Sequence, residues 1–222
     1  MPESSRVIPV GDYRRKPWSN GLGTTREIAR GSFCGRAGVD TDASDSNAWP
    51  WRLSIADIDH DAAYSTFRGV QREQVLLSGN GVRLAFDDGE QRELEPPHGR
   101  ACFDGARGVR AELIEGPVQV FNLMWRPDCV SVELLHRPLA GSMLFFIEPG
   151  VLWAVHLLAG RAGFGAGSGL PLLQGGDTAL LMGSDGGSRH MLEGGGEILA
   201  IRIAGRESSN PLNPGFQYTS RR

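Results

Sequence analysis

The sequence of 222 residues contains a single lysine, Lys16, and no surplus of basic residues. Its 23 Lys and Arg residues are outnumbered by 26 Asp and Glu residues, which gives a formal net charge of −3. A general nucleic-acid-binding protein needs a basic surface, so we expect no nucleic-acid partner. Lys16 stands in a polar, arginine-flanked stretch and is therefore a poor candidate for a Schiff-base lysine.

Cysteines and long apolar runs are also scarce. Cys34, Cys102 and Cys129 form no Cys-x-x-Cys pair, which argues against a disulfide framework or a structural zinc site. The first thirty residues lack the apolar segment of a signal peptide. The most apolar stretch, residues 143–158, is broken at residues 148–150 into runs too short to span a bilayer. We therefore expect a cytoplasmic protein with no membrane partner.

What the sequence does contain is glycine, 31 residues of it, between short β-rich runs. Few segments keep an apolar period of 3.6 residues, so an antiparallel sandwich or barrel is predicted. Residues 35–48 are predicted to form a mobile loop, and the tail from Asn210 to wrap the surface or fray. The predicted strands cover residues 51–57, 74–77, 82–86, 100–103, 109–115, 118–125, 130–135, 143–148, 151–158, 178–181 and 197–203.

A weak internal repeat indicates a duplicated architecture. The Leu-Leu-x-Gly segment at residues 76–79 recurs at residues 157–160, and two later segments match at similar offsets: 100–103 with 177–180, and 118–123 with 198–203. We therefore predict an all-β fold of two cupin-like (double-stranded β-helix or jelly-roll) barrels, packed together as a bicupin. The expected halves are residues 1–140 and 141–222, interlocked as one compact unit.

The five histidines, His60, His98, His136, His156 and His190, lack the spacing of a metal site inside a barrel. Alternate residues of a strand share one face, so such a site usually needs a His-x-His pair, and the sequence has none. His156 and His190 could still meet in the second barrel, but separate positions on strands or turns are favoured. We expect no metal and no cofactor.

The segment Trp18–Ile28 is the first candidate for binding chemistry. Its Gly21-x-Gly23 pair lacks the third glycine and the βαβ context of a dinucleotide loop, so that interpretation is rejected. Asn20-Gly21 favours a tight turn before a strand that begins at Thr25. The alternative is that Trp18, Asn20 and the two threonines line a pocket as an aromatic wall with neutral hydrogen-bonding groups. The pattern alone favours the turn.

The strand at residues 51–57 has the clearest alternation of apolar and polar residues. Trp51, Leu53 and Ile55 share one face, and Arg52, Ser54 and Ala56 share the other. In a barrel the second face could line the lumen, where an arginine can bind a carboxylate in a bidentate manner; otherwise Arg52 lies in solvent. The same alternation at residues 121–125 places Asn122 beside Met124, and residues 64–73 carry further arginines and aromatic side chains.

Taken in order, these segments resemble the HutD/Ves family of bicupin proteins. The resemblance implies two interlocked cupin barrels without a histidine metal triad, an association with histidine catabolism, and binding of a small acid such as formylglutamate. The matching pieces are Trp18–Ile28, Trp51–Ile58, Tyr64–Glu73, Leu76–Leu84 and Val120–Arg126. The residues that the resemblance marks as ligand-binding are Trp18, Asn20, Gly21, Thr24, Arg52, Ser54, Phe67, Arg72, Asn122 and Met124.

The sequence departs from the family pattern at three positions. Ala62 stands where glycine is usual, Tyr64 where phenylalanine is usual, and Arg68 where proline is usual. The change at Tyr64 is mild. Arg68 either adds a second cation at the rim of the pocket or points into water, and in the first case the ligand would differ.

Three functions remain open at this point. The favoured one is a metal-free protein that binds a small carboxylate and regulates histidine or amino-acid catabolism. The alternative is a metal-free cupin hydrolase or isomerase, for which His60, Asp57 and Tyr64 are the nearest candidate bases, although Asp57 lies on the face opposite Arg52. The third is a scaffold without a ligand. Exposed strand edges would allow a homodimer.

Overall fold

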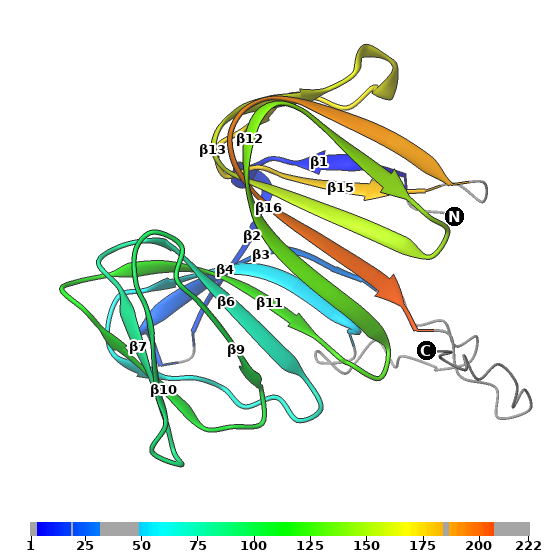
Figure 1. Cartoon of the computed structure of the whole chain (residues 1–222). Helices are drawn as coiled ribbons and strands as arrows, with labels where there is room; N and C mark the ends of the chain where they lie inside the picture. Colours follow the sequence, from blue (N-terminus) through cyan, green and yellow to red (C-terminus); the bar gives the residue numbers. More distant parts are fainter. Residues whose placement is uncertain (1–3, 19, 32–48, 184–186, 207–222) are drawn as a thin grey trace, which may run out of the picture.

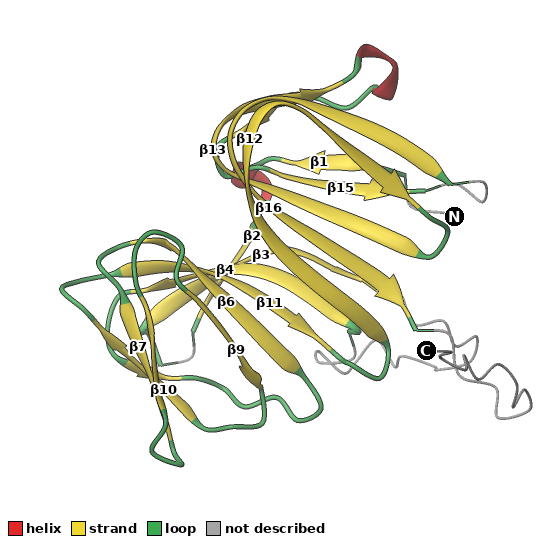
Figure 2. Cartoon of the chain, in the orientation of Figure 1, coloured by secondary structure: helices red, strands yellow, loops and turns green. Residues whose placement is uncertain are grey.

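The structure, a computed structural model, describes residues 4–18, 20–31, 49–183 and 187–206. Strands dominate these residues, which confirms the predicted all-β fold (Figure 2). Within the described residues, helical structure is limited to two short turns, and none of it is long and apolar enough to cross a membrane. The segment 35–48, the tail from Asn210 and Cys34 lie outside the described residues. The helical turns are η1 (Val10–Asp12) and η2 (Ala166–Ser168).

The first half of the fold is a large antiparallel sheet covered on one face by a smaller one (Figure 1). A core that draws apolar side chains from both sheets fills the space between them. In sheet order, the large sheet consists of β2 (Arg14–Pro17), β3 (Gly23–Gly31), β4 (Trp51–Ile58), β11 (Val118–Trp125), β6 (Gln71–Ser78) and β9 (Arg100–Asp104). The small sheet consists of β5 (Ala62–Ala63), β10 (Val109–Leu113), β7 (Val82–Phe86) and β8 (Gln91–Leu94).

The second half is one sheet whose three longest strands curl back over its own core (Figure 1). The runs 130–135 and 143–148 were predicted as separate strands, but they belong to a single strand, β12, which pairs with β16 along its full length. In sheet order, the strands are β1 (Arg6–Ile8), β15 (Thr178–Met182), β13 (Val151–Phe164), β16 (Ser188–Gly205) and β12 (Val130–Ile147), with β14 (Leu173–Gln174) paired to β13.

Glycines lie where these long strands pair at mid-length. Gly160 of β13 has φ +95 and pairs with Gly196 of β16, which has φ +138. A Cβ atom added to Gly160 would lie 2.0 Å from the carbonyl oxygen of Gly195. Only residues without a side chain fit two backbones that approach so closely at positive φ.

The two large sheets pack face to face through a shared core. Leu53 and Phe121 of the first sheet belong to the same buried cluster as Leu199 and Ile201 of the second. All four side chains are fully excluded from solvent. The odd-numbered face of β4, predicted to be apolar, is the face that packs in this cluster, so its even-numbered face points the other way.

The internal repeat is present in the structure. Strands β11, β6 and β9 follow one another in the first sheet as β16, β13 and β15 do in the second. Each Leu-Leu-x-Gly segment carries a register shift at its second leucine, Leu77 in β6 and Leu158 in β13. The halves also share chain segments, because β12 crosses residue 140 and β1 pairs with β15.

Candidate functional site

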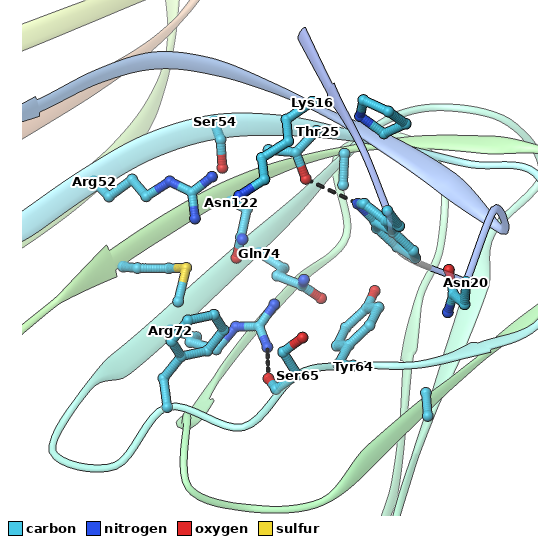
Figure 3. A pocket seen from close by; sticks show the side chains of 16 residues that line it. Lys16, Asn20, Thr25, Arg52, Ser54, Tyr64, Ser65, Arg72, Gln74 and Asn122 are labelled. Atoms are coloured by element: carbon cyan, nitrogen blue, oxygen red, sulfur yellow. Dashed lines mark hydrogen bonds between the residues drawn. The ribbon is translucent and has the colours of Figure 1, made fainter. Parts of the chain in front are cut away.

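A cavity of about 330 Å³ lies against the inner, even-numbered face of β4, β11 and β6 (Figure 3). The pairing of β11 with β4 and β6 arranges the floor of the cavity in two rows. Asn122 lies between Ser54 and Gln74, and Met124 lies between Arg52 and Arg72. Such a volume suits a small organic ligand. The lining residues are Lys16, Pro17, Trp18, Asn20, Thr25, Arg52, Ser54, Ala56, Ala63, Tyr64, Ser65, Phe67, Arg72, Gln74, Asn122 and Met124.

The charges that line the cavity have one sign. Lys16, Arg52 and Arg72 bring three cationic side chains to it, and none of its described lining residues is acidic. Arg52 is partly balanced from outside the lining, because its Nε lies 2.9 Å from Glu27 Oε2. The side chains of Arg52 and Arg72, with those of Asn122 and Gln74, converge on a common space (Figure 3). An anion entering this space would be attracted from several sides.

Arg72 is the most buried of the three cations, with 5% of its surface exposed. Its guanidinium carbon lies 4.8 Å from the ring centre of Tyr64, 5.2 Å from that of Phe103 and 5.8 Å from that of Phe67. Burial lowers the pKa of Arg72 to about 10; Tyr64 opposes this shift, and the charge of Arg52 adds to it. Arg72 therefore keeps its charge at neutral pH. Aromatic faces surround its guanidinium, Nη1 donates to the carbonyl of Ser65 at 3.4 Å, and no carboxylate of the described residues forms an ion pair with it.

Several buried polar atoms of the lining lack a hydrogen-bond partner. They are Ser54 Oγ, Tyr64 Oη, Arg72 Nε, Gln74 Oε1 and Asn122 Oδ1. Buried polar groups are normally paired, because leaving one unpaired costs about 1–3 kcal/mol. Such atoms gathered around one cavity mark the positions where a polar ligand would form its hydrogen bonds. Burial also raises the pKa of Tyr64, so its phenol remains a hydrogen-bond donor.

The N-terminal motif forms one wall of the cavity. The indole N–H of Trp18 donates to Thr25 Oγ1 at 2.9 Å, and the Trp18 ring meets Tyr64 edge to face at 6.3 Å. The predicted tight turn is also present: Gly21 has φ +69, and its N–H donates to the carbonyl of Trp18. The two interpretations of this motif are therefore compatible, since the turn is what directs Trp18 and Asn20 toward the cavity.

The structure places eight of the ten expected ligand-binding residues in the lining of the cavity. Gly21 and Thr24 are not among the lining residues; Gly21 makes the turn, and it is Thr25 rather than Thr24 that faces the cavity. Arg68 is exposed and outside the lining, so the second of its two interpretations holds. The lining residues Lys16, Gln74 and Ser65 were not predicted, and Thr25 was expected only in the alternative that both threonines of the N-terminal motif line a pocket. Alternation from Arg72 would have found Gln74, but no local pattern indicated Lys16.

The candidate bases of the enzymatic alternative lie in unequal surroundings. Asp57 is outside the lining and is held in a bidentate pair by Arg26, with contacts of 2.8 and 2.9 Å. His60 is exposed and also outside it, whereas Tyr64 lines the cavity. The expectation that the histidines lie apart is wrong for one pair: the rings of His98 and His136 are 4.9 Å apart, and neither residue lines this cavity.

Comparison with known proteins identifies similar chains. The HutD family model matches residues 10–200. A Pseudomonas putida protein described as an uncharacterized 21.2 kDa protein in the hutC 3' region is 38% identical over 129 residues, which are 58% of this chain and 62% of that protein. Protein Ves of Escherichia fergusonii is 34% identical over 130 residues, 55% of this chain and 60% of that one. The matches thus span about three fifths of these relatives' own length.

Solved structures match over more of the chain. HutD from Pseudomonas fluorescens SBW25 has a TM-score of 0.74 and 30% identity, and the match covers 92% of this chain and all of that one. The oxalate decarboxylase of Lactobacillus farciminis matches with a TM-score of 0.56 over 92% of this chain and 87% of its own. At 10% identity this match shows only that the two chains share a fold, and that fold is the cupin fold.

Proposed function

The chain belongs to the HutD family, and from that membership and the cavity we propose that it binds a small carboxylate such as formylglutamate. The observation that carries the proposal is the charge of the cavity: three cationic side chains line it and no acidic one does within the described residues. Arg52 and Arg72 each offer a planar group that matches a carboxylate in shape and hydrogen-bonding geometry.

The arginines and the apolar lining together can account for micromolar binding of a carboxylate. A hydrogen bond to a charged group contributes about 1.5–3 kcal/mol, whereas micromolar binding needs about 8 kcal/mol in total. Two arginines therefore supply much of the required free energy, and the apolar lining supplies the rest. Trp18, Phe67 and Met124 offer apolar surface for the carbon chain of the ligand. A dicarboxylic amino-acid derivative uses both kinds of group.

The residues that line the cavity favour binding without catalysis. General acid–base catalysis needs a titratable group within reach of the reacting proton. Among the described lining residues, neither a histidine nor a carboxylate supplies one, and burial raises the pKa of Tyr64 away from neutrality. A regulatory role in histidine catabolism is supported by the family and by the hutC 3' region named for the Pseudomonas putida relative.

Calorimetry with the purified full-length protein tests the proposal. Formylglutamate should bind one molecule per chain and raise the melting temperature. Arg52→Ala should weaken binding at least about tenfold, the loss expected for one charged hydrogen bond. Arg68→Ala removes an exposed arginine outside the cavity and should leave the affinity within about twofold of the parent. The melting temperature of ligand-free Arg52→Ala shows whether that variant still folds.

Other results of these experiments would refute carboxylate binding or establish catalysis instead. No heat from formylglutamate or related amino-dicarboxylates would refute carboxylate binding, and so would equal losses from Arg52→Ala and Arg68→Ala. NMR spectra of the acid incubated with metal-stripped protein distinguish binding from turnover. An unchanged acid supports a binding protein, whereas product formation would establish the hydrolase or isomerase alternative.

A further inference from the structure

Two histidines and a glutamate meet where the two halves of the fold adjoin, apart from the cavity. His98 lies in the connection between β8 and β9 of the first half, whereas His136 lies on β12 and Glu197 on β16 of the second. Glu197 Oε2 lies 3.2 Å from His98 Nε2 and 3.1 Å from His136 Nε2. The three candidate ligand atoms all lie within 4.8 Å of one another.

The surroundings of His98 fix how its ring is protonated. His98 Nδ1 lies 3.0 Å from the carbonyl oxygen of Leu76, which can only accept a hydrogen bond. Nδ1 therefore carries the proton, and in the neutral ring Nε2 presents a lone pair. That lone pair points toward Glu197 Oε2, 3.2 Å away, so the two atoms are placed to share one metal ion.

The backbone around His98 holds the ring in this position. Leu76 binds the connection twice, because its N–H donates to the carbonyl of Gly99 at 2.9 Å while its carbonyl accepts from the His98 ring. His98 itself has φ +57, a backbone conformation that non-glycine residues adopt uncommonly. A histidine whose second ring nitrogen donates to a backbone carbonyl is the usual arrangement of a metal-ligating imidazole.

We propose that His98, His136 and Glu197 form a binding site for a divalent transition-metal ion of the Zn²⁺ class. Two imidazoles and one carboxylate favour such an ion over Mg²⁺ or Ca²⁺, which prefer oxygen ligands. In a tetrahedral Zn²⁺ site with bonds of about 2.0–2.1 Å, ligand atoms lie roughly 3.3 Å apart, close to the two separations seen here. The ion would cross-link the halves, since its ligands come from both.

Titration of the chelator-treated full-length protein with Zn²⁺ tests this site. One ion should bind per chain and raise the melting temperature. His136→Asn and Glu197→Gln should each weaken Zn²⁺ binding at least about tenfold, as loss of a ligand does. His60→Asn changes an exposed histidine outside the cluster and should bind Zn²⁺ as the parent does. Anomalous scattering at the zinc edge should place the ion between the three side chains.

The proposal is overturned if Zn²⁺ does not bind stoichiometrically, if the cluster variants bind it like the parent, or if the ion lies elsewhere. In each of these cases the three side chains form a polar contact between the halves rather than a metal site. Formylglutamate titration of the same variants separates this site from the cavity. Because no cluster residue lines the cavity, carboxylate affinity should remain unchanged whether or not Zn²⁺ binds.

Discussion

Arg72 is stabilised differently from Arg52, although both line the same cavity. Arg52 has a carboxylate partner in Glu27, whereas Arg72 is surrounded by aromatic rings and receives no such compensation from the described residues. Burying a charge without a paired opposite charge is costly, even when aromatic faces lower the cost. The burial of Arg72 therefore lowers the stability of the fold, which is common for residues that serve binding.

Replacement of this side chain should separate stability from binding. Arg72→Met keeps most of the buried volume and removes the charge, so the melting temperature should stay level or rise. The affinity for formylglutamate should nevertheless fall at least about tenfold, because one charged hydrogen bond is lost. Thermal unfolding and calorimetry on the same sample measure both quantities. A variant that loses stability and keeps its affinity would show that Arg72 serves the fold instead.

A chain of hydrogen bonds ends at a second buried group, His156. The Tyr13 hydroxyl donates to the carbonyl of Gly176 at 2.5 Å, so the Thr178 hydroxyl donates to the Tyr13 oxygen at 2.7 Å. Thr178 Oγ1 is then left to accept from His156 Nδ1 at 2.9 Å. The neutral tautomer of His156 is therefore defined. Burial lowers the pKa of His156 to about 4, against an opposing effect of Asp177.

The protein should consequently lose stability on mild acidification. The unfolded state takes up a proton near pH 6.5, but folded His156 does so only near its pKa of about 4. Stability is thus complete above about pH 6.5 and decreases by up to about 3 kcal/mol as the pH falls toward 4. Urea unfolding across this range measures the slope. His156→Gln should remove this contribution, whereas His60→Gln, at an exposed position, should not.

At the scale of the element, the glycines that pair between β13 and β16 decide whether the long strands can curl. Gly160→Ala combines an unfavourable φ with a close contact to the Gly195 carbonyl. We expect the free energy of unfolding to fall by at least about 2 kcal/mol. Gly167→Ala, where an added Cβ atom meets open space, should change it by less than about 0.5 kcal/mol. Chemical denaturation would contradict this if the two variants were equally stable.

The elements that sequence analysis predicted best are those with a clear alternation. In β4 and β11 every second residue belongs to the shared core, so the faces of Arg52 and Asn122 could be predicted. Strand β2 was missed because all four of its residues are exposed and three are charged. Its pairing with β3, which brings Lys16 opposite Thr25 at the cavity, is a register relation that no local pattern encodes. Pro138 and Gly141 hid the continuity of β12 in the same way, by resembling a turn.

The histidine cluster could not be predicted because it depends on tertiary contacts alone. His98 and His136 come from different halves, and 38 positions of the sequence separate them. Cross-strand register then brings Glu197 to β12, where it pairs directly with Pro138. The resemblance to a family supplied the cavity residues, but nothing in the motifs that carry it includes these three positions.

The whole molecule should unfold in one step. Because the core between the large sheets belongs to both halves, neither half keeps its buried surface without the other. Leu199→Ala, in the second sheet, should lower the free energy of unfolding by about 2–5 kcal/mol. Leu172→Ala makes the same change at an exposed position and should cost less than about 0.5 kcal/mol. Calorimetric traces with two resolved transitions would show that the halves are independent.

The pairing of β1 with β15 limits which parts of this chain can be exchanged by recombination. Residues 6–8 close the outer edge of a sheet whose other strands come from residues 130–205, while the segment that follows them belongs to the opposite sheet. A gene fusion or recombination event that exchanged only the C-terminal part would leave this strand facing a foreign edge. Strand β1 and the C-terminal part of the chain must therefore be inherited together, although more than 160 residues separate the partners Ile8 and Thr178.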